Sequence, residues 1–83
     1  MRGGVARIEF GLARASRVRV SVFDLAGRQV MSLADQAFEA GVHRIEWNGR
    51  DASGSRVRAG AYFLRVQTDD RRFRSVRKVI LVD

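Results

Sequence analysis

Carboxylates and one histidine are the side chains of this sequence considered first for acid–base or metal chemistry. A glycosidase needs two carboxylates that face each other across a sugar, a thiolate nucleophile needs a cysteine, and a zinc site commonly needs cysteines or several histidines. The chain has no cysteine, and His43 is its one histidine. The carboxylates considered for catalysis are scattered: Asp24, Asp35, Glu39, Glu46 and Asp51. The pattern therefore predicts no catalytic residues, no cofactor and no enzyme activity.

A polar loop offers the best candidate metal ligands. Asn48, Asp51 and Ser53 carry side-chain oxygens, and Gly54 follows them. An EF-hand loop needs acids at alternate positions and a distal bidentate glutamate, and this loop has neither. We therefore expect these side chains to bond to the backbone of their own turn, and we predict no metal site.

Trp47 and His43 could in principle contact a ligand, because tryptophan stacks on bases or sugars and histidine binds metals. Both residues lie in the segment 42–47, in phase with Ile45. Alternate residues of a strand point to the same face. The spacing therefore favours a core tryptophan and a partly buried structural histidine.

The basic residues raise a different possibility. The net charge is +7, and all sixteen basic residues except Lys78 are arginine. This balance suits nucleic acid, an anionic glycan or a membrane surface. However, Phe73 and Phe63 are the only aromatic residues that could interleave with the arginines as RNA and DNA surfaces require. We expect solvated arginine faces and no specific nucleic-acid binding.

The sequence also bears on location. No apolar run approaches the ~20 residues of a membrane span, so we predict no membrane insertion. Residues 1–4 lack the apolar stretch of a signal peptide. If the domain is exported, we expect the signal to lie upstream in a larger precursor.

The elements that position these residues are strands. Apolar and polar residues alternate along most of the chain, which predicts half-buried strands over residues 5–12, 17–22, 28–33, 42–47, 61–68 and 73–82. Residues 34–41 are less regular and predict a crossing loop or a short edge segment. Turn signals recur about every 8–12 residues, as in β-sandwiches. We therefore predict one all-β domain over residues 1–83, an antiparallel β-sandwich of about seven strands that is immunoglobulin- or fibronectin type III-like.

The inward positions of these strands predict the core. Its expected residues are Phe10, Val20, Val22, Ile45, Trp47, Tyr62 and Leu64, together with Ile8 and Val66. The last strand is ambiguous, because residues 76, 80 and 82 are apolar with one parity and residues 79 and 81 with the other. A bulge near Arg77 and Lys78, or burial of both faces, would reconcile the two.

A series of short motifs runs in order along nearly the whole chain. The motifs are IEFGL (8–12), VRVSVFD (18–24), GRQV (27–30), GVHRIEWNGRD (41–51), GAYF (60–63) and RKVIL (77–81). Their order resembles the immunoglobulin-like domain of the flagellar hook-capping protein family. That family overlaps with the C-terminal sorting domains of type IX secretion.

The resemblance implies a non-catalytic C-terminal domain of a larger secreted or surface bacterial protein. Such a domain would act in sorting or anchoring, or as a structural module. The implied partner is a protein, either export or anchoring machinery or other domains of the parent protein. Two alternatives are a hook-cap-type assembly module and an arginine-rich binder of an anionic polymer, either nucleic acid or glycan.

The last strand and the turn before Tyr62 are the expected recognition surface. Its residues are Gly60, Tyr62, Arg77, Lys78 and Ile80. A partner could extend the free edge of this strand by strand addition, and Arg77 and Lys78 would add charge for steering. The alternative is that this strand only completes the sandwich.

Overall fold

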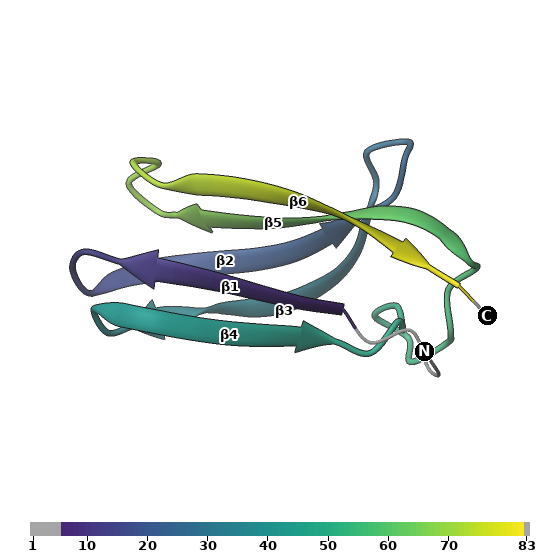
Figure 1. Cartoon of the computed structure of the whole chain (residues 1–83), viewed down its shortest axis with the longest axis horizontal. Helices are drawn as coiled ribbons and strands as arrows, with labels where there is room; N and C mark the ends of the chain where they lie inside the picture. The colour runs from purple at the N-terminus through teal and green to yellow at the C-terminus, as the bar shows by residue number, and fades with distance from the viewer. Residues whose placement is uncertain (1–5, 83) are drawn as a thin grey trace.

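The part of the chain that the structure describes forms six strands (Figure 1). The structure, a computed structural model, describes residues 6–82, so Val5 and the leading residues 1–4 lie outside the described part. The strands are β1 (Ala6–Leu12), β2 (Ser16–Phe23), β3 (Gln29–Phe38), β4 (Gly41–Trp47), β5 (Gly60–Thr68) and β6 (Arg74–Leu81). No helix among the described residues is long and apolar enough to cross a membrane. The predicted all-β class is confirmed, with six strands where about seven were expected.

The strands form two antiparallel sheets. The smaller sheet pairs β1 with β4, and the larger sheet has the order β3-β2-β5-β6. Side chains from both sheets share one hydrophobic core, so the sheets pack face to face as a sandwich. The predicted antiparallel sandwich is therefore confirmed, and β6 is an end strand of the larger sheet.

Period-two alternation explains the core. In β1 and β5 every second residue is buried, and the residues between them are exposed or half-buried. The largest fully buried side chains among residues 6–82 are Trp47, Leu64, Val18, Val20, Val22 and Val66. Ile8, Phe10 and Tyr62 join this cluster, whereas Ile45 is half-buried and packs against it. Burial of each large aliphatic side chain stabilises the fold by about 1.5–3 kcal/mol.

The β2–β3 connection is a tight turn held by one carboxylate. Asp24 Oδ1 accepts hydrogen bonds from the backbone N–H groups of Ala26 (3.0 Å) and Arg28 (2.9 Å). The Arg28 backbone bond and the nearby Arg28 charge hold the pKa of Asp24 below its usual value. Gly27 adopts a φ of 85°, which glycine reaches without steric penalty.

The expectation for residues 34–41 was wrong. Strand β3 continues to Phe38 and pairs with β2 along its length. Two register shifts place Leu33 and Val30 outside the pairing, as extra residues of β3. After each extra residue, the side chains that follow point to the opposite face of the sheet from the one the alternation predicts. The alternation in the sequence is therefore broken, although the strand continues.

The parity of β6 has a different explanation from the two predicted. Strand β6 pairs with β5 from Gly60↔Leu81 to Gln67↔Arg74 without a register shift, so there is no bulge. Leu81 is buried and Val79 half-buried on the inner face, while Val76 (51% exposed) and Ile80 (60% exposed) are on the outer face. The strand is therefore apolar on both faces, and nothing within the described residues covers its outer one.

Candidate protein-binding surface

The polar loop after β4 uses its oxygens internally. Asp51 Oδ1 accepts hydrogen bonds from Ser53 Oγ (2.7 Å) and from the backbone N–H groups of Ser53 and Ser55, both at 3.0 Å. These bonds lower the pKa of the Asp51 carboxyl. Asn48 Oδ1 accepts the backbone N–H of Arg50 at 3.1 Å. The loop therefore shows the predicted bonding of side chains to their own turn.

Trp47 is fully buried, so it offers no stacking platform for a base or a sugar. Its indole Nε1 donates a hydrogen bond to the backbone carbonyl of Arg50 at 2.8 Å. Tyr62 is also buried, and its hydroxyl donates to the backbone carbonyl of Arg58 at 2.8 Å. Both aromatic side chains thus tie the long β4–β5 connection to the core.

His43 is half-buried among aromatic rings. Its ring centroid lies 5.6 Å from that of Phe10 and 4.9 Å from that of Phe38. Its Nε2 forms a 2.7 Å hydrogen bond with the backbone carbonyl of Glu39. The histidine therefore packs across the β3–β4 connection, and it is partly buried, as the alternation predicted.

Most acidic side chains of the described residues are held by arginines on the surface. The ion pairs are Arg7–Glu46, Arg17–Asp35, Arg19–Asp69, Arg28–Asp24, Arg44–Glu9 and Arg72–Asp70. The pairs on β1 and β4 join directly opposed residues of the smaller sheet. Exposed pairs contribute little to stability, about 0–1 kcal/mol each. Their effect on the surface charge matters more here, because the cations outside these pairs carry the excess positive charge.

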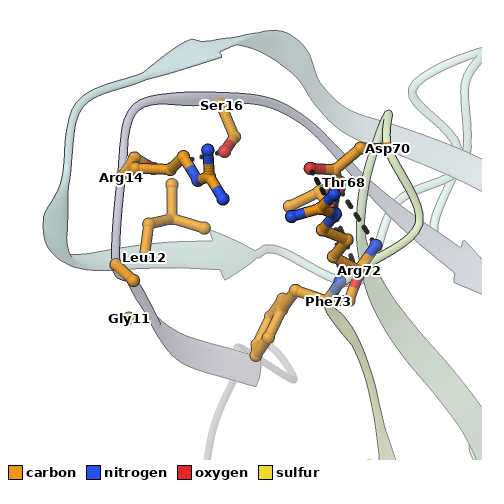
Figure 2. Close-up of a pocket in the computed structure, with 9 residues that line it drawn as sticks. Gly11, Leu12, Arg14, Ser16, Thr68, Asp70, Arg72 and Phe73 are labelled. Atoms are coloured by element: carbon orange, nitrogen blue, oxygen red, sulfur yellow. Dashed lines mark hydrogen bonds and ion pairs between the residues drawn. The ribbon is translucent and has the colours of Figure 1, made fainter.

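One hollow lies between the β1–β2 and β5–β6 connections and has a volume of about 300 Å³ (Figure 2). Leu12 and Phe73 give it an apolar part, and Thr68, Asp70 and Arg72 lie on the β5–β6 side. Its polar atoms bond within the turn, since Thr68 Oγ1 donates to Asp70 Oδ1 (2.7 Å) and accepts the Phe73 backbone N–H (3.1 Å). The Arg72 backbone N–H and the Thr68 hydroxyl lower the pKa of Asp70. The hollow is thus a gap between two turns, and these polar atoms are already hydrogen-bonded.

The five predicted recognition residues lie in one strand pair but do not share a face. Gly60 and Tyr62 begin β5, opposite Leu81 and Val79 of β6. Lys78 and Ile80 point to the outer face, in the rows of Phe63 and Ala61. Arg77 lies in the row of Leu64, on the inner side, but is exposed. The Tyr62 ring is in the core, so only its backbone could meet a partner.

Sequence reasoning missed the residues that accompany Lys78 and Ile80 on this side. We call this set the outer face: Phe23, Phe63, Arg65, Arg74, Val76, Lys78 and Ile80, carried by β2, β5 and β6. A second hollow, of about 290 Å³, lies here against Phe23, Phe63 and Val76. The double parity of residues 73–82 was the signal that could have revealed it.

Two sheets with a shared core, a buried tryptophan and a buried tyrosine bonded to an upstream carbonyl define an immunoglobulin-like domain. The sequence model of the FlgD Ig-like domain matches residues 2–71. The chain therefore belongs to the FlgD Ig-like domain family. No curated protein matches the chain.

Solved structures support this assignment. FlgD from P. aeruginosa superposes with a TM-score of 0.71 at 26% identity, over 93% of this chain and 60% of that one. FlgD from Xanthomonas campestris, described in terms of hook capping essential for flagellar assembly, has a TM-score of 0.71 at 28% identity, over 94% of this chain and 56% of that one. The chain thus spans little more than half of these FlgD chains.

A more distant likeness concerns the fold alone. PorZ, a surface component of the type-IX secretion system of Porphyromonas gingivalis, has a TM-score of 0.59 at 20% identity. The match covers 96% of this chain and 12% of PorZ. The same sandwich therefore occurs in proteins of very different length.

Proposed function

We propose that this domain is a non-catalytic assembly module of a larger bacterial protein that works outside the cell or on its surface. Its partners are proteins, as in a hook-cap assembly. The carrying observation is the family match over residues 2–71, together with two FlgD structures of the same fold. The surface chemistry supports this function, because the carboxylates predicted as scattered are engaged mainly in ion pairs and turn bonds.

A domain exchange tests the assembly function. Residues 1–83 replace the Ig-like domain of P. aeruginosa FlgD, and hook completion is scored by swimming and by electron microscopy. We expect partial restoration compared with a strain that lacks the domain. A graft that carries Trp47→Ala serves as the control for a strongly destabilised domain. A graft that is folded and protease-resistant, but no better than the deletion, would contradict the proposal.

Sorting or anchoring is the second candidate, and the position of β6 supports it. As an end strand, β6 has one edge without a partner in the described residues, which a receptor could extend. Residues 1–83 are fused to a passenger in a type IX-competent host. Export that is lost on deletion of residues 76–83, with the rest still folded, would support recognition. A folded fusion that stays in the periplasm would refute sorting and leave the assembly function.

A further inference from the structure

We propose that the outer face binds an acidic polypeptide segment of a separate protein, which packs apolar side chains against β5 and β6. This proposal deepens the proposed function, and it rests on that function in taking the partner to be a protein. It also moves the expected contact from the edge of β6 to the face of the larger sheet.

The outer face exposes a large apolar surface. Val76 and Ile80 are 51% and 60% exposed. Phe63 lies between them in the adjacent strand, because Lys78 is opposite Phe63 and Ile80 is opposite Ala61. Phe23 extends this apolar surface into β2, directly opposite Phe63. A sheet face that meets water is normally polar, so this surface is typical of a contact site.

The shape of the surface supports the same conclusion. The hollow of about 290 Å³ is lined by Phe23, Leu25, Phe63 and Val76 together with Arg65 and Arg74. Leu25 at its margin is 71% exposed. Binding energy concentrates where an anchor side chain enters such a pocket. The hollow therefore offers a seat for one large apolar side chain of the partner.

The outer face also carries positive charge. The Arg65 guanidinium carbon lies 4.5 Å from the centroid of the Phe23 ring. A guanidinium over a ring can still direct N–H donors at a carboxylate. Lys78 and Arg74 lie on the neighbouring strand, opposite Phe63 and Gln67. No ion pair found among residues 6–82 involves these three cations.

The carboxylate that lines this hollow already has partners within the domain. Asp24 pairs with Arg28 at 3.4 Å and accepts two backbone N–H groups of its turn. The outer face thus presents apolar anchors among positive charges. Charge complementarity points to an acidic partner. A second copy of this chain would bring the same cations and a net charge of +7 to the contact.

Peptide display tests the proposal with the 83-residue chain as the target. Randomised peptides on phage are selected at low salt, and enriched sequences are synthesised with a fluorophore. We expect enriched peptides to combine Asp or Glu with aromatic or large aliphatic residues. Fluorescence anisotropy should then show about tenfold weaker binding for Ile80→Ser and for Lys78→Glu.

Two matched variants control for nonspecific effects. Val42→Ser removes an exposed aliphatic side chain from β4 in the other sheet, and Arg56→Glu makes the same charge change in the β4–β5 connection. Both should bind as the unchanged chain does, and circular dichroism melts check that all variants fold. Equal losses in the controls would overturn the outer face as the site.

Other outcomes also decide the matter. No enrichment, or enrichment of basic peptides, would overturn the proposal. Sedimentation that shows a dimer abolished by Ile80→Ser would assign the face to a second copy and overturn it too. The readout does not depend on flagellar assembly: a failed domain exchange with intact peptide binding would refute the proposed function alone.

Discussion

The rings of Trp47 and Tyr62 meet edge to face, with centroids 5.3 Å apart and an interplanar angle of 66°. Each residue also sends its polar atom to a backbone carbonyl in the connection between β4 and β5. The pair therefore joins the two sheets and fixes the one long connection of the fold. An aromatic pair of this geometry adds about 0.5–1.5 kcal/mol beyond burial of its area.

Truncation of the tryptophan should destabilise the domain severely. Trp47→Ala removes a fully buried ring and its hydrogen bond to the Arg50 carbonyl. We expect the free energy of unfolding, measured in urea, to fall by about 3–5 kcal/mol. Small domains have about 5–15 kcal/mol in total, so this variant should be only marginally folded. A loss below about 1 kcal/mol would contradict the burial of Trp47.

Removal of one hydroxyl tests the tyrosine tether. Tyr62→Phe keeps the ring in the core but leaves the Arg58 carbonyl without its 2.8 Å donor. We expect a loss of about 1–2 kcal/mol in the same urea experiment. Phe63→Leu, at the next position but on the outer face, controls for small changes in β5. Unchanged stability in Tyr62→Phe would mean that water replaces the lost hydroxyl.

We expect the backbone conformation of Gly60, rather than the space around it, to disfavour substitution. Gly60 has a φ of 147°, and a Cβ there would meet no atom within 4 Å. Any loss in Gly60→Val would therefore report conformational strain, of about 1–3 kcal/mol. Gly11→Val is the matched control, because Gly11 has the same open space without a positive φ. Equal melting temperatures for both variants would refute the strain.

The free energy of unfolding should fall in acid, because carboxylates that accept hydrogen bonds in turns become protonated. The pKa of Asp51 is lowered in the folded state, first by the Ser53 hydroxyl and then by the Ser55 N–H. Its contribution is present above the ordinary pKa of about 4 and is lost as the pH falls through the lower, folded-state value. Asp51→Asn should lower stability at neutral pH and flatten this decline. Urea unfolding between about pH 2 and pH 7 measures it, and parallel curves would contradict the assignment.

Nucleic-acid binding should be weak and independent of sequence. The surplus arginines would bind phosphates by counterion release, so affinity for duplex DNA should fall steeply between about 50 and 200 mM salt. Fluorescence anisotropy with two unrelated duplexes measures this. Sequence-selective binding that persists at physiological salt would contradict the expectation.

The half-buried strands could be predicted, because alternation of apolar and polar residues indicates a strand with one face exposed to solvent. In β1 the pattern is complete, from Ala6 to Leu12, and in β5 it predicts Tyr62 and Leu64 as buried. Strand β3 was missed beyond Leu33 because unpaired extra residues break the alternation. Tertiary pairing with β2 decides that strand, and pairing is not encoded in the local pattern.

The outer face was harder to predict because its members are far apart in the sequence. Phe23 and Phe63 are separated along the chain by β3 and β4 but are directly opposed in the larger sheet. Only the register brings Arg65 over Phe23. The local pattern of β6 left a bulge and burial of both faces as alternatives, and the register and topology were needed to show two apolar faces and to identify the uncovered one.

The route of the chain has a mechanical consequence. The start of β1 and the end of β6 lie toward the same end of the sandwich, while the β1–β2, β3–β4 and β5–β6 connections lie at the other (Figure 1). A pulling force applied through these two ends would peel strands from their tips and break hydrogen bonds one at a time. In a longer protein under tension, both attachment points of such a domain would therefore lie at one end of the sandwich, and its strands would separate from that end.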